Sequence, residues 1–188
     1  MCGACLVAAP NHDAAFAAVG YGYPWDRLIA GFKFHAALEL ATPFVELMEQ
    51  AWRATQPAVL PSMLLPVPLS DARLRERGYN QAWELARRLA RRLQAPAHAS
   101  LLLRMRDTPA QQALPLGGRA ANVRRAFALE PRRATEVRGH HVMLVDDVMT
   151  SGSTADEISR VLRAAGAARV DVCVFARTPR PGDGAAGP

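Results

Sequence analysis

Apolar and polar positions divide the 188-residue chain into short buried segments and longer amphipathic ones. Four short apolar runs bounded by turn residues predict buried strands, at residues 14–23, 63–67, 142–145 and 170–175. Apolar residues at every third or fourth position predict helices, at residues 25–55 with a break near Thr42-Pro43, at 81–93 and at 154–165. Strands that alternate with helices predict an α/β fold with a mainly parallel central sheet flanked by helices.

The remaining segments are shorter or more polar. Residues 101–103 and 127–129 are two further strand candidates, and residues 70–79 are expected to form a charged loop. Residues 104–122 predict a long polar loop, which is unusual inside a compact domain unless it has a function. The tail, residues 178–188, is rich in Pro, Gly and Ala and is expected to be disordered.

Composition excludes several classes of protein. Half of the residues are hydrophobic and 21% are charged, so the chain can build a core. Residues 54–70 are the longest uncharged stretch that could suggest a membrane segment, but their four prolines exclude a membrane span. Three cysteines are too few for a disulfide framework, and the first 26 residues lack the basic region of a secretory signal. The expected compartment is therefore the cytoplasm.

The charge balance adds a functional indication. The net charge is +6, and 22 of the 23 basic residues are arginines, with Lys33 as the only lysine. An excess of positive charge favours anionic ligands or partners. We attribute the ratio of Arg to Lys mainly to a GC-rich genome, and the net charge partly to function.

The most informative segment is residues 142–154, Val-Met-Leu-Val-Asp-Asp-Val-Met-Thr-Ser-Gly-Ser-Thr. An apolar strand leads into Asp146 and Asp147, then into hydroxyl side chains around Gly152, and then into a helix. Adjacent acids before a helix are often only a capping turn. Here, however, the loop and the helix N-terminus together offer a binding site for a phosphate, and the carboxylates can bind sugar hydroxyls or Mg²⁺. Because ligands of open α/β sheets bind at the carboxyl ends of strands, the segment predicts a site for a phosphorylated ribose.

These thirteen residues resemble the phosphoribosyl pyrophosphate (PRPP) signature of type I phosphoribosyltransferases. The resemblance implies that Asp146 and Asp147 form the catalytic acid pair, which holds the ribose hydroxyls, and that Mg²⁺ accompanies the pyrophosphate. It implies that the 5′-phosphate is bound by Thr150, Ser151, Gly152, Ser153 and Thr154.

Other segments are similar to the ComF family of competence-associated, phosphoribosyltransferase-like proteins. The similar positions are residues 25–34, 66–69 and 73–81, and Arg104, Thr108, Gln111, Leu114, Arg119, Asn122, Val123 and Phe127. The resemblance implies a type I phosphoribosyltransferase fold over residues 13–177, with a small N-terminal hood-like segment. It also implies that pyrophosphate is contacted by Arg73, Arg75 and Arg77 after the first buried strand, and by Arg104 and Arg119 from a loop that closes over the ligand.

The cysteines and most of the histidines lie well away from this signature. Cys2 and Cys5 have the spacing of half a zinc ribbon, and ComF-like proteins often begin with such a ribbon. Residues 1–12 are therefore interpreted as its remnant, left by truncation or by a wrongly assigned start. With too few ligands for a complete site, no zinc is expected in this chain. Cys173 is expected to be a core residue, and His140 and His141 to lie in a solvated turn.

Two functions of different classes follow from this sequence. A ComF-type phosphoribosyltransferase would transfer phosphoribosyl from PRPP to a nitrogen nucleophile and release pyrophosphate. A non-catalytic competence accessory protein would act in single-stranded DNA uptake with a helicase partner, and its exposed aromatic residues would stack on bases. The candidates for stacking are Tyr21, Tyr23, Trp25, Tyr79 and Trp83, although Trp83 lies on a predicted helix and is expected to pack there instead. The arginines of the 81–93 helix suit either a solvated face or a weak nucleic-acid patch.

Overall fold

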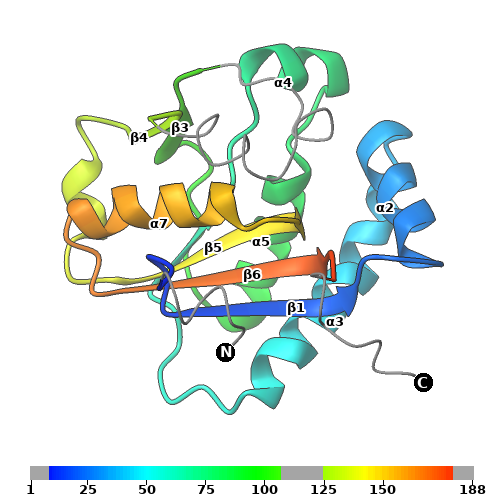
Figure 1. Cartoon of the computed structure of the whole chain (residues 1–188), viewed down its shortest axis with the longest axis horizontal. Helices are drawn as coiled ribbons and strands as arrows, with labels where there is room; N and C mark the ends of the chain where they lie inside the picture. The colour runs from blue at the N-terminus through cyan, green and yellow to red at the C-terminus, as the bar shows by residue number, and fades with distance from the viewer. Residues whose placement is uncertain (1–8, 107–124, 180–188) are drawn as a thin grey trace.

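A parallel sheet of four strands organises the residues that the computed structural model describes, 9–106 and 125–179. In spatial order the strands are β1 (Ala14–Gly20), β6 (Arg169–Arg177), β5 (His141–Met149) and β2 (Met63–Pro66). Each neighbouring pair runs parallel, so all the carboxyl ends lie at one edge of the sheet (Figure 1). The predicted α/β fold with a mainly parallel sheet is confirmed.

Helices cover both faces of this sheet. Helices α3 (Ala41–Ala54) and α5 (Gln81–Leu93) pack on one face, and α7 (Ser153–Ala164) packs on the other (Figure 1). A hydrophobic core lies on each face of the sheet, and alternate residues of the central strands belong to one core or the other. Met143 and Val145 pack with α3 and α5, whereas Leu144 packs with α7. Because both faces are covered, the strands are apolar on both sides, as the short apolar runs of the sequence predict.

Helix α2 (Trp25–Phe34) stands at the carboxyl edge of the sheet and fits the expected N-terminal hood-like segment (Figure 1). The break in the long helical region lies earlier than predicted. Helix α2 ends at Phe34, the short 3₁₀ helix η1 (Leu38–Leu40) follows, and α3 begins at Ala41. Pro43 lies in the first turn of α3, where a missing N–H donor has no cost, so it does not break the helix.

The segment after β2 is helical, and the prediction of a charged loop at residues 70–79 is wrong. Helix α4 (Asp71–Arg77) begins where the Ser70 hydroxyl accepts a hydrogen bond from the Arg73 N–H at 3.4 Å. It ends at Gly78, whose N–H donates to the Leu74 carbonyl at 2.8 Å. These local caps stabilise a short helix despite its dense charge.

The two remaining strand candidates pair with each other. Strands β3 (Leu102–Arg104) and β4 (Phe127–Leu129) form a separate antiparallel sheet, which packs on the α7 side of the core. A 3₁₀ helix, η3 (Ala134–Val137), leads from β4 toward β5. None of the helices described has the length and apolar composition that crossing a membrane requires.

Three predictions fall on residues outside the described ranges. They are the zinc-ribbon remnant with Cys2 and Cys5, most of the polar loop 104–122, and the tail from residue 180 onward. The domain limits 1–12, 13–177 and 178–188 therefore stay predictions.

Candidate functional site

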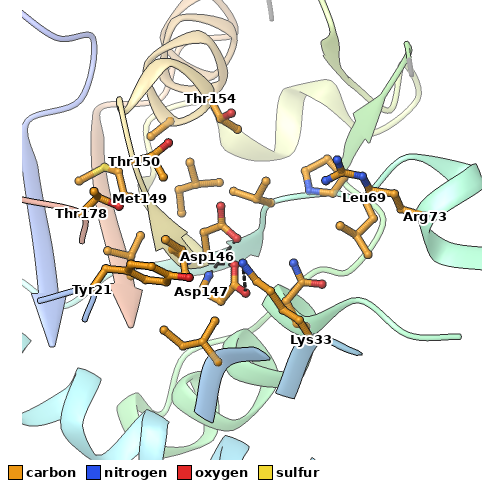
Figure 2. Close-up of a pocket in the computed structure, with 18 of the residues that line it drawn as sticks. Tyr21, Lys33, Leu69, Arg73, Asp146, Asp147, Met149, Thr150, Thr154 and Thr178 are labelled. Atoms are coloured by element: carbon orange, nitrogen blue, oxygen red, sulfur yellow. Dashed lines mark hydrogen bonds and ion pairs between the residues drawn. The ribbon is translucent and has the colours of Figure 1, made fainter. Parts of the chain in front are cut away.

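A cavity of about 630 Å³ opens at the carboxyl edge of the sheet (Figure 2). This volume suits a ligand of small-molecule size. Strand β5 contributes the acid pair, and the loop before α7 contributes hydroxyl groups. Helices α2 and α4 and strand β3 contribute cationic side chains. The cavity thus joins segments that lie far apart in the sequence.

The acid pair lies inside β5, which extends to Met149 rather than ending at Val145 as the sequence suggested. The Asp146 Oδ1 accepts the Asp147 N–H at 2.9 Å, and the Asp147 Oδ1 accepts the Val148 N–H at 2.9 Å. The Asp147 side chain is only 4% exposed, and its Oδ2 lies 2.9 Å from the Lys33 Nζ (Figure 2). Local backbone donors therefore hold both carboxylates at the cavity.

Burial raises the pKa of Asp146 well above its ordinary value. The neighbouring charge of Asp147 raises this pKa further, and the ammonium of Lys33 lowers it. Asp146 therefore binds a proton more readily than an ordinary aspartate. A cation or hydrogen-bond donors brought by a ligand would favour ionisation of both acids.

The hydroxyl-rich loop lies at the start of α7. Gly152 has a φ of 82°, a left-handed conformation that favours glycine, and no side chain caps the helix at this position. The Ser151 Oγ and the Ser153 Oγ lie 3.0 Å apart. Thr150, Gly152, Ser153 and Thr154 line the cavity, whereas Ser151 does not. Four of the five predicted phosphate-site residues thus meet at the cavity. Ser151 contacts one of them, Ser153, through its hydroxyl group.

The predicted arginines divide into two groups. Arg73 and Arg77, four residues apart on α4, line the cavity together with Arg104 of β3. Arg75 is exposed and is not among the residues that line the cavity, so its contact with ligand stays a prediction that the cavity does not support. Helix formation explains the split, because residues two apart lie on different faces of a helix. Arg119 lies in the part of the chain that is not described.

Several cavity residues were absent from the predicted site. In the sequence Lys33 stands out only as the sole lysine and as part of the family resemblance, and its pairing with Asp147 is a long-range contact. Tyr21 and Phe34 also line the cavity, with 38% and 66% of their surfaces exposed. The guanidinium of Arg77 lies 5.3 Å from the centre of the Phe34 ring. The rarity of lysine and the family resemblance of residues 25–34 were the signals that pointed toward this part of the site.

The histidines and the cysteine within residues 9–106 and 125–179 do not line the cavity. His141 is buried at the opposite edge of the sheet, with its Nε2 2.9 Å from the Asp171 Oδ2, so its prediction as part of a solvated turn is wrong. His140 is exposed. Cys173 is buried in the core as predicted, and burial raises the pKa of its thiol to about 12.

Comparisons with known proteins indicate the family of this chain. A family model described as "Phosphoribosyl transferase domain" matches residues 79–183. "Competence protein F" of Haemophilus influenzae is 36% identical over 179 residues, which cover 94% of this chain and 78% of that protein. The chain belongs to the ComF family. "DNA utilization protein YhgH" of Escherichia coli K12 is 34% identical over 180 residues, with the same coverage of 94% and 78%.

Solved structures that are similar to this ComF protein are more distant in sequence. The "structure of the allosteric regulatory enzyme of purine biosynthesis" is 23% identical, with a TM-score of 0.43, over 71% of this chain and 25% of that chain. The hypoxanthine phosphoribosyl transferase of Trypanosoma cruzi is 17% identical, with a TM-score of 0.45, over 80% and 69% of the two chains.

Proposed function

We propose that this protein binds PRPP with Mg²⁺ at the carboxyl edge of its sheet, in the cytoplasm, and transfers the phosphoribosyl group to a nitrogen nucleophile. One observation carries the proposal. An acid pair, a hydroxyl loop at a helix N-terminus and several cationic side chains line the same cavity (Figure 2). Each group has a counterpart in PRPP, which combines two hydroxyls, a phosphate and a diphosphate on one ribose.

The position of each group indicates its role. The loop from Thr150 to Thr154 offers hydroxyls and the backbone N–H groups of α7 to the 5′-phosphate. Asp146 and Asp147 accept hydrogen bonds from the ribose hydroxyls. Arg73 and Arg77 stabilise the negative charge of the diphosphate.

In the transfer, the bond from ribose C1 to the diphosphate oxygen breaks and a bond from C1 to the nitrogen nucleophile forms. The bonding electrons leave with pyrophosphate, and the nucleophile gives up a proton. Positive charge develops on the ribose as the bond breaks, so the carboxylates stabilise the reacting sugar and the guanidinium groups stabilise the leaving group. Positioning and electrostatic stabilisation are therefore the main contributions of the protein.

The donor set fits Mg²⁺ that arrives with the ligand. Within residues 9–106 and 125–179, no group of three or more metal-ligating side chains gathers. Mg²⁺ commonly binds through one or two carboxylates together with substrate phosphates and water. Asp146 and Asp147 would supply the carboxylate oxygens, and the ion would neutralise charge on the diphosphate when bound.

Calorimetric titration of PRPP with Mg²⁺ tests the proposal. Wild-type protein should show saturable binding, and the variant Asp146→Asn/Asp147→Asn should bind at least about 100-fold more weakly, because it loses two charge-assisted interactions. Glu39→Gln, which changes an exposed carboxylate outside the cavity, should bind as wild type does. Absence of binding to the wild type, or equal binding by the acid-pair variant, would reject the proposed site.

A second candidate function is favoured by the rim of the cavity. Tyr21 and Phe34 are exposed at the cavity, and Tyr23, two residues after Tyr21, is exposed as well. The Arg27 guanidinium lies 5.5 Å from the centre of the Tyr23 ring. Exposed aromatic rings interleaved with cations suit stacking of bases from single-stranded DNA. The relatives named for competence and DNA utilization are compatible with an accessory role in DNA uptake beside a helicase.

The other aromatic residues predicted for stacking have structural roles. Trp25 packs edge-on against Phe175, with ring centres 5.6 Å apart, and Trp83 packs against the α3–α5 core. The Tyr79 hydroxyl donates to the Phe32 carbonyl, and burial raises the pKa of this hydroxyl. Any base-stacking surface is therefore confined to the rim.

Fluorescence anisotropy with a labelled single-stranded oligonucleotide separates the two functions. A binding module should keep salt-sensitive DNA binding in Asp146→Asn/Asp147→Asn and lose it in Tyr23→Ala/Phe34→Ala. An enzyme should release pyrophosphate from PRPP in the presence of an acceptor, and the acid-pair variant should abolish this release.

A further inference from the structure

The only lysine of the chain lies beside the acid pair of the candidate site. Lys33 lines the cavity, its side chain is 21% exposed, and its Nζ lies 2.9 Å from the Asp147 Oδ2. The other 22 basic residues of the chain are all arginines. An ammonium is a compact cation that can turn between partners, whereas a guanidinium binds through a fixed planar fork. The single position at which the chain has lysine instead of arginine therefore lies beside the buried carboxylate of Asp147.

The contact between these two side chains is a charge pairing rather than an aligned hydrogen bond. The Asp147 Oδ1 accepts the Val148 N–H, but no donor within the described ranges is aligned with the Asp147 Oδ2. Oδ2 is thus the oxygen with capacity for a sugar hydroxyl, and the ammonium already lies against it. Oδ2 is itself buried with the ammonium against it, so a sugar hydroxyl can reach this oxygen only when the ammonium moves aside.

The backbone around Lys33 is held independently of this pairing. Phe32 is fully buried, and its carbonyl accepts a hydrogen bond from the Tyr79 hydroxyl. Phe34 lies under the guanidinium of Arg77. Helix α2 is therefore fixed on both sides of Lys33, so the flexible lysine side chain can move while the helix stays in place.

We propose that Lys33 is a ligand-binding residue that changes partner when PRPP binds. In the empty protein its ammonium pairs with Asp147. In the complex it pairs with the diphosphate, and Asp147 is released to accept a ribose hydroxyl. The inference rests on the proposed function, and it gives the site a means of distinguishing PRPP from ribose 5-phosphate, which has no diphosphate to receive the ammonium.

The exchange predicts opposite effects of one substitution on two ligands. Lys33→Met should weaken PRPP binding about tenfold, because a charge-assisted contact to the diphosphate is lost. The same variant should bind ribose 5-phosphate as tightly as the wild type or more tightly, because Asp147 no longer has to be released. Lys33→Arg, which keeps the charge, should recover most of the PRPP affinity.

Calorimetry with both ligands tests these effects, with Arg132→Met as the control. Arg132 is an exposed arginine outside the cavity, so its loss should change neither affinity by more than about twofold. If the wild type binds PRPP and Lys33→Met binds it equally well, the partner exchange is rejected while the proposed function stands. If the wild type binds neither ligand, the proposed function itself fails.

Chemical labelling of the wild type tests the exchange without a substitution. An amine-selective acylating reagent has one lysine target in this chain, and the N-terminal amine is an internal reference for mass spectrometry. PRPP should slow acylation of Lys33, because the diphosphate holds the ammonium. Ribose 5-phosphate should speed it, because the ammonium loses Asp147 without gaining a new partner. Equal slowing by both ligands would mean that they merely cover the lysine, and would overturn the proposal.

Discussion

The two edges of the parallel sheet each bury an aspartate beside a cationic side chain, but only one edge has the features of a binding site. At the amino edge, Asp171 is 1% exposed, with the Arg169 Nε 3.0 Å from its Oδ1 and the His141 Nε2 2.9 Å from its Oδ2. At the carboxyl edge, Asp147 is almost as buried, yet its Oδ2 has only an unaligned ammonium as partner. Both aspartates are buried, but only Asp171 has an aligned partner for each oxygen.

The surroundings of Asp171 and of the acid pair also differ in whether they leave room for a ligand. The ring of His141 lies between Asp171 and the Leu60 carbonyl, 3.3 Å from its Nδ1, so each ring nitrogen has a partner. The acid pair at the other edge faces a cavity of about 630 Å³. A satisfied buried ion pair stabilises a structure only modestly but is costly to break. A buried carboxylate that has an oxygen without a hydrogen-bond donor and lies at a cavity is instead available to bind a ligand.

Substitution of the two aspartates tests this contrast most strongly. Asp171→Asn should lower the free energy of unfolding by about 3 kcal/mol, because it removes the buried carboxylate that His141 and Arg169 both contact. Asp147→Asn should cost less than about 1 kcal/mol, since Lys33 can turn into the cavity and the repulsion from Asp146 is relieved. Urea unfolding followed by circular dichroism measures both values. Equal losses at the two edges would remove the distinction between them.

The dependence of stability on pH provides the next test. Burial and the charge of Asp147 raise the pKa of Asp146 in the folded chain. The stability that this group contributes is therefore fully present below its unfolded pKa of about 4, and is lost as pH rises through the folded pKa. Asp146→Asn cannot ionise, so its free energy of unfolding should exceed that of the wild type increasingly as pH rises above about 4.

Urea midpoints at acidic, intermediate and slightly alkaline pH measure this difference. Glu39→Gln, at an exposed position, is the control and should follow the wild type throughout. A constant difference between Asp146→Asn and the wild type would mean that ionisation of Asp146 does not destabilise the empty site.

Two arginines of α4 test whether the carboxyl edge binds anions through the cavity or through its overall charge. Arg73→Ala should weaken PRPP binding about tenfold, because Arg73 lines the cavity. Arg75→Ala removes the same charge from the outer side of the helix and should change the affinity by less than about twofold. Similar losses in both titrations would indicate long-range attraction instead of direct contact.

The smallest expected effects concern the two glycines at the ends of α7. Gly152 and Gly166 have φ values of 82° and 94°, so alanine at either position should cost about 1 kcal/mol in unfolding free energy. Only Gly152 lies at the cavity. Titration of ribose 5-phosphate should therefore show weaker binding by Gly152→Ala and unchanged binding by Gly166→Ala. The opposite result would place the phosphate elsewhere.

Contiguous features were predicted well from the sequence. The strand, the acid pair, the hydroxyl loop and the helix all fall within residues 141–164, so their relation depends on local backbone preference and on the alternation of apolar residues. Segments with conflicting signals were predicted poorly. The dense charge of α4 favours a loop, although Ser70 and Gly78 cap a helix there, and Pro43 suggests a break although the first turn of a helix tolerates proline.

The sequence by itself determined the strand–acid–hydroxyl–helix segment, because every part of it is encoded by neighbouring residues. It also determined the family, through similarity along 94% of the chain. Only the tertiary structure decided that Lys33 meets Asp147, that Arg73 and not Arg75 lines the cavity, and that His141 is buried against Asp171. The physical reason is that these contacts join separate elements, whose side chains meet only after the helices pack on the sheet.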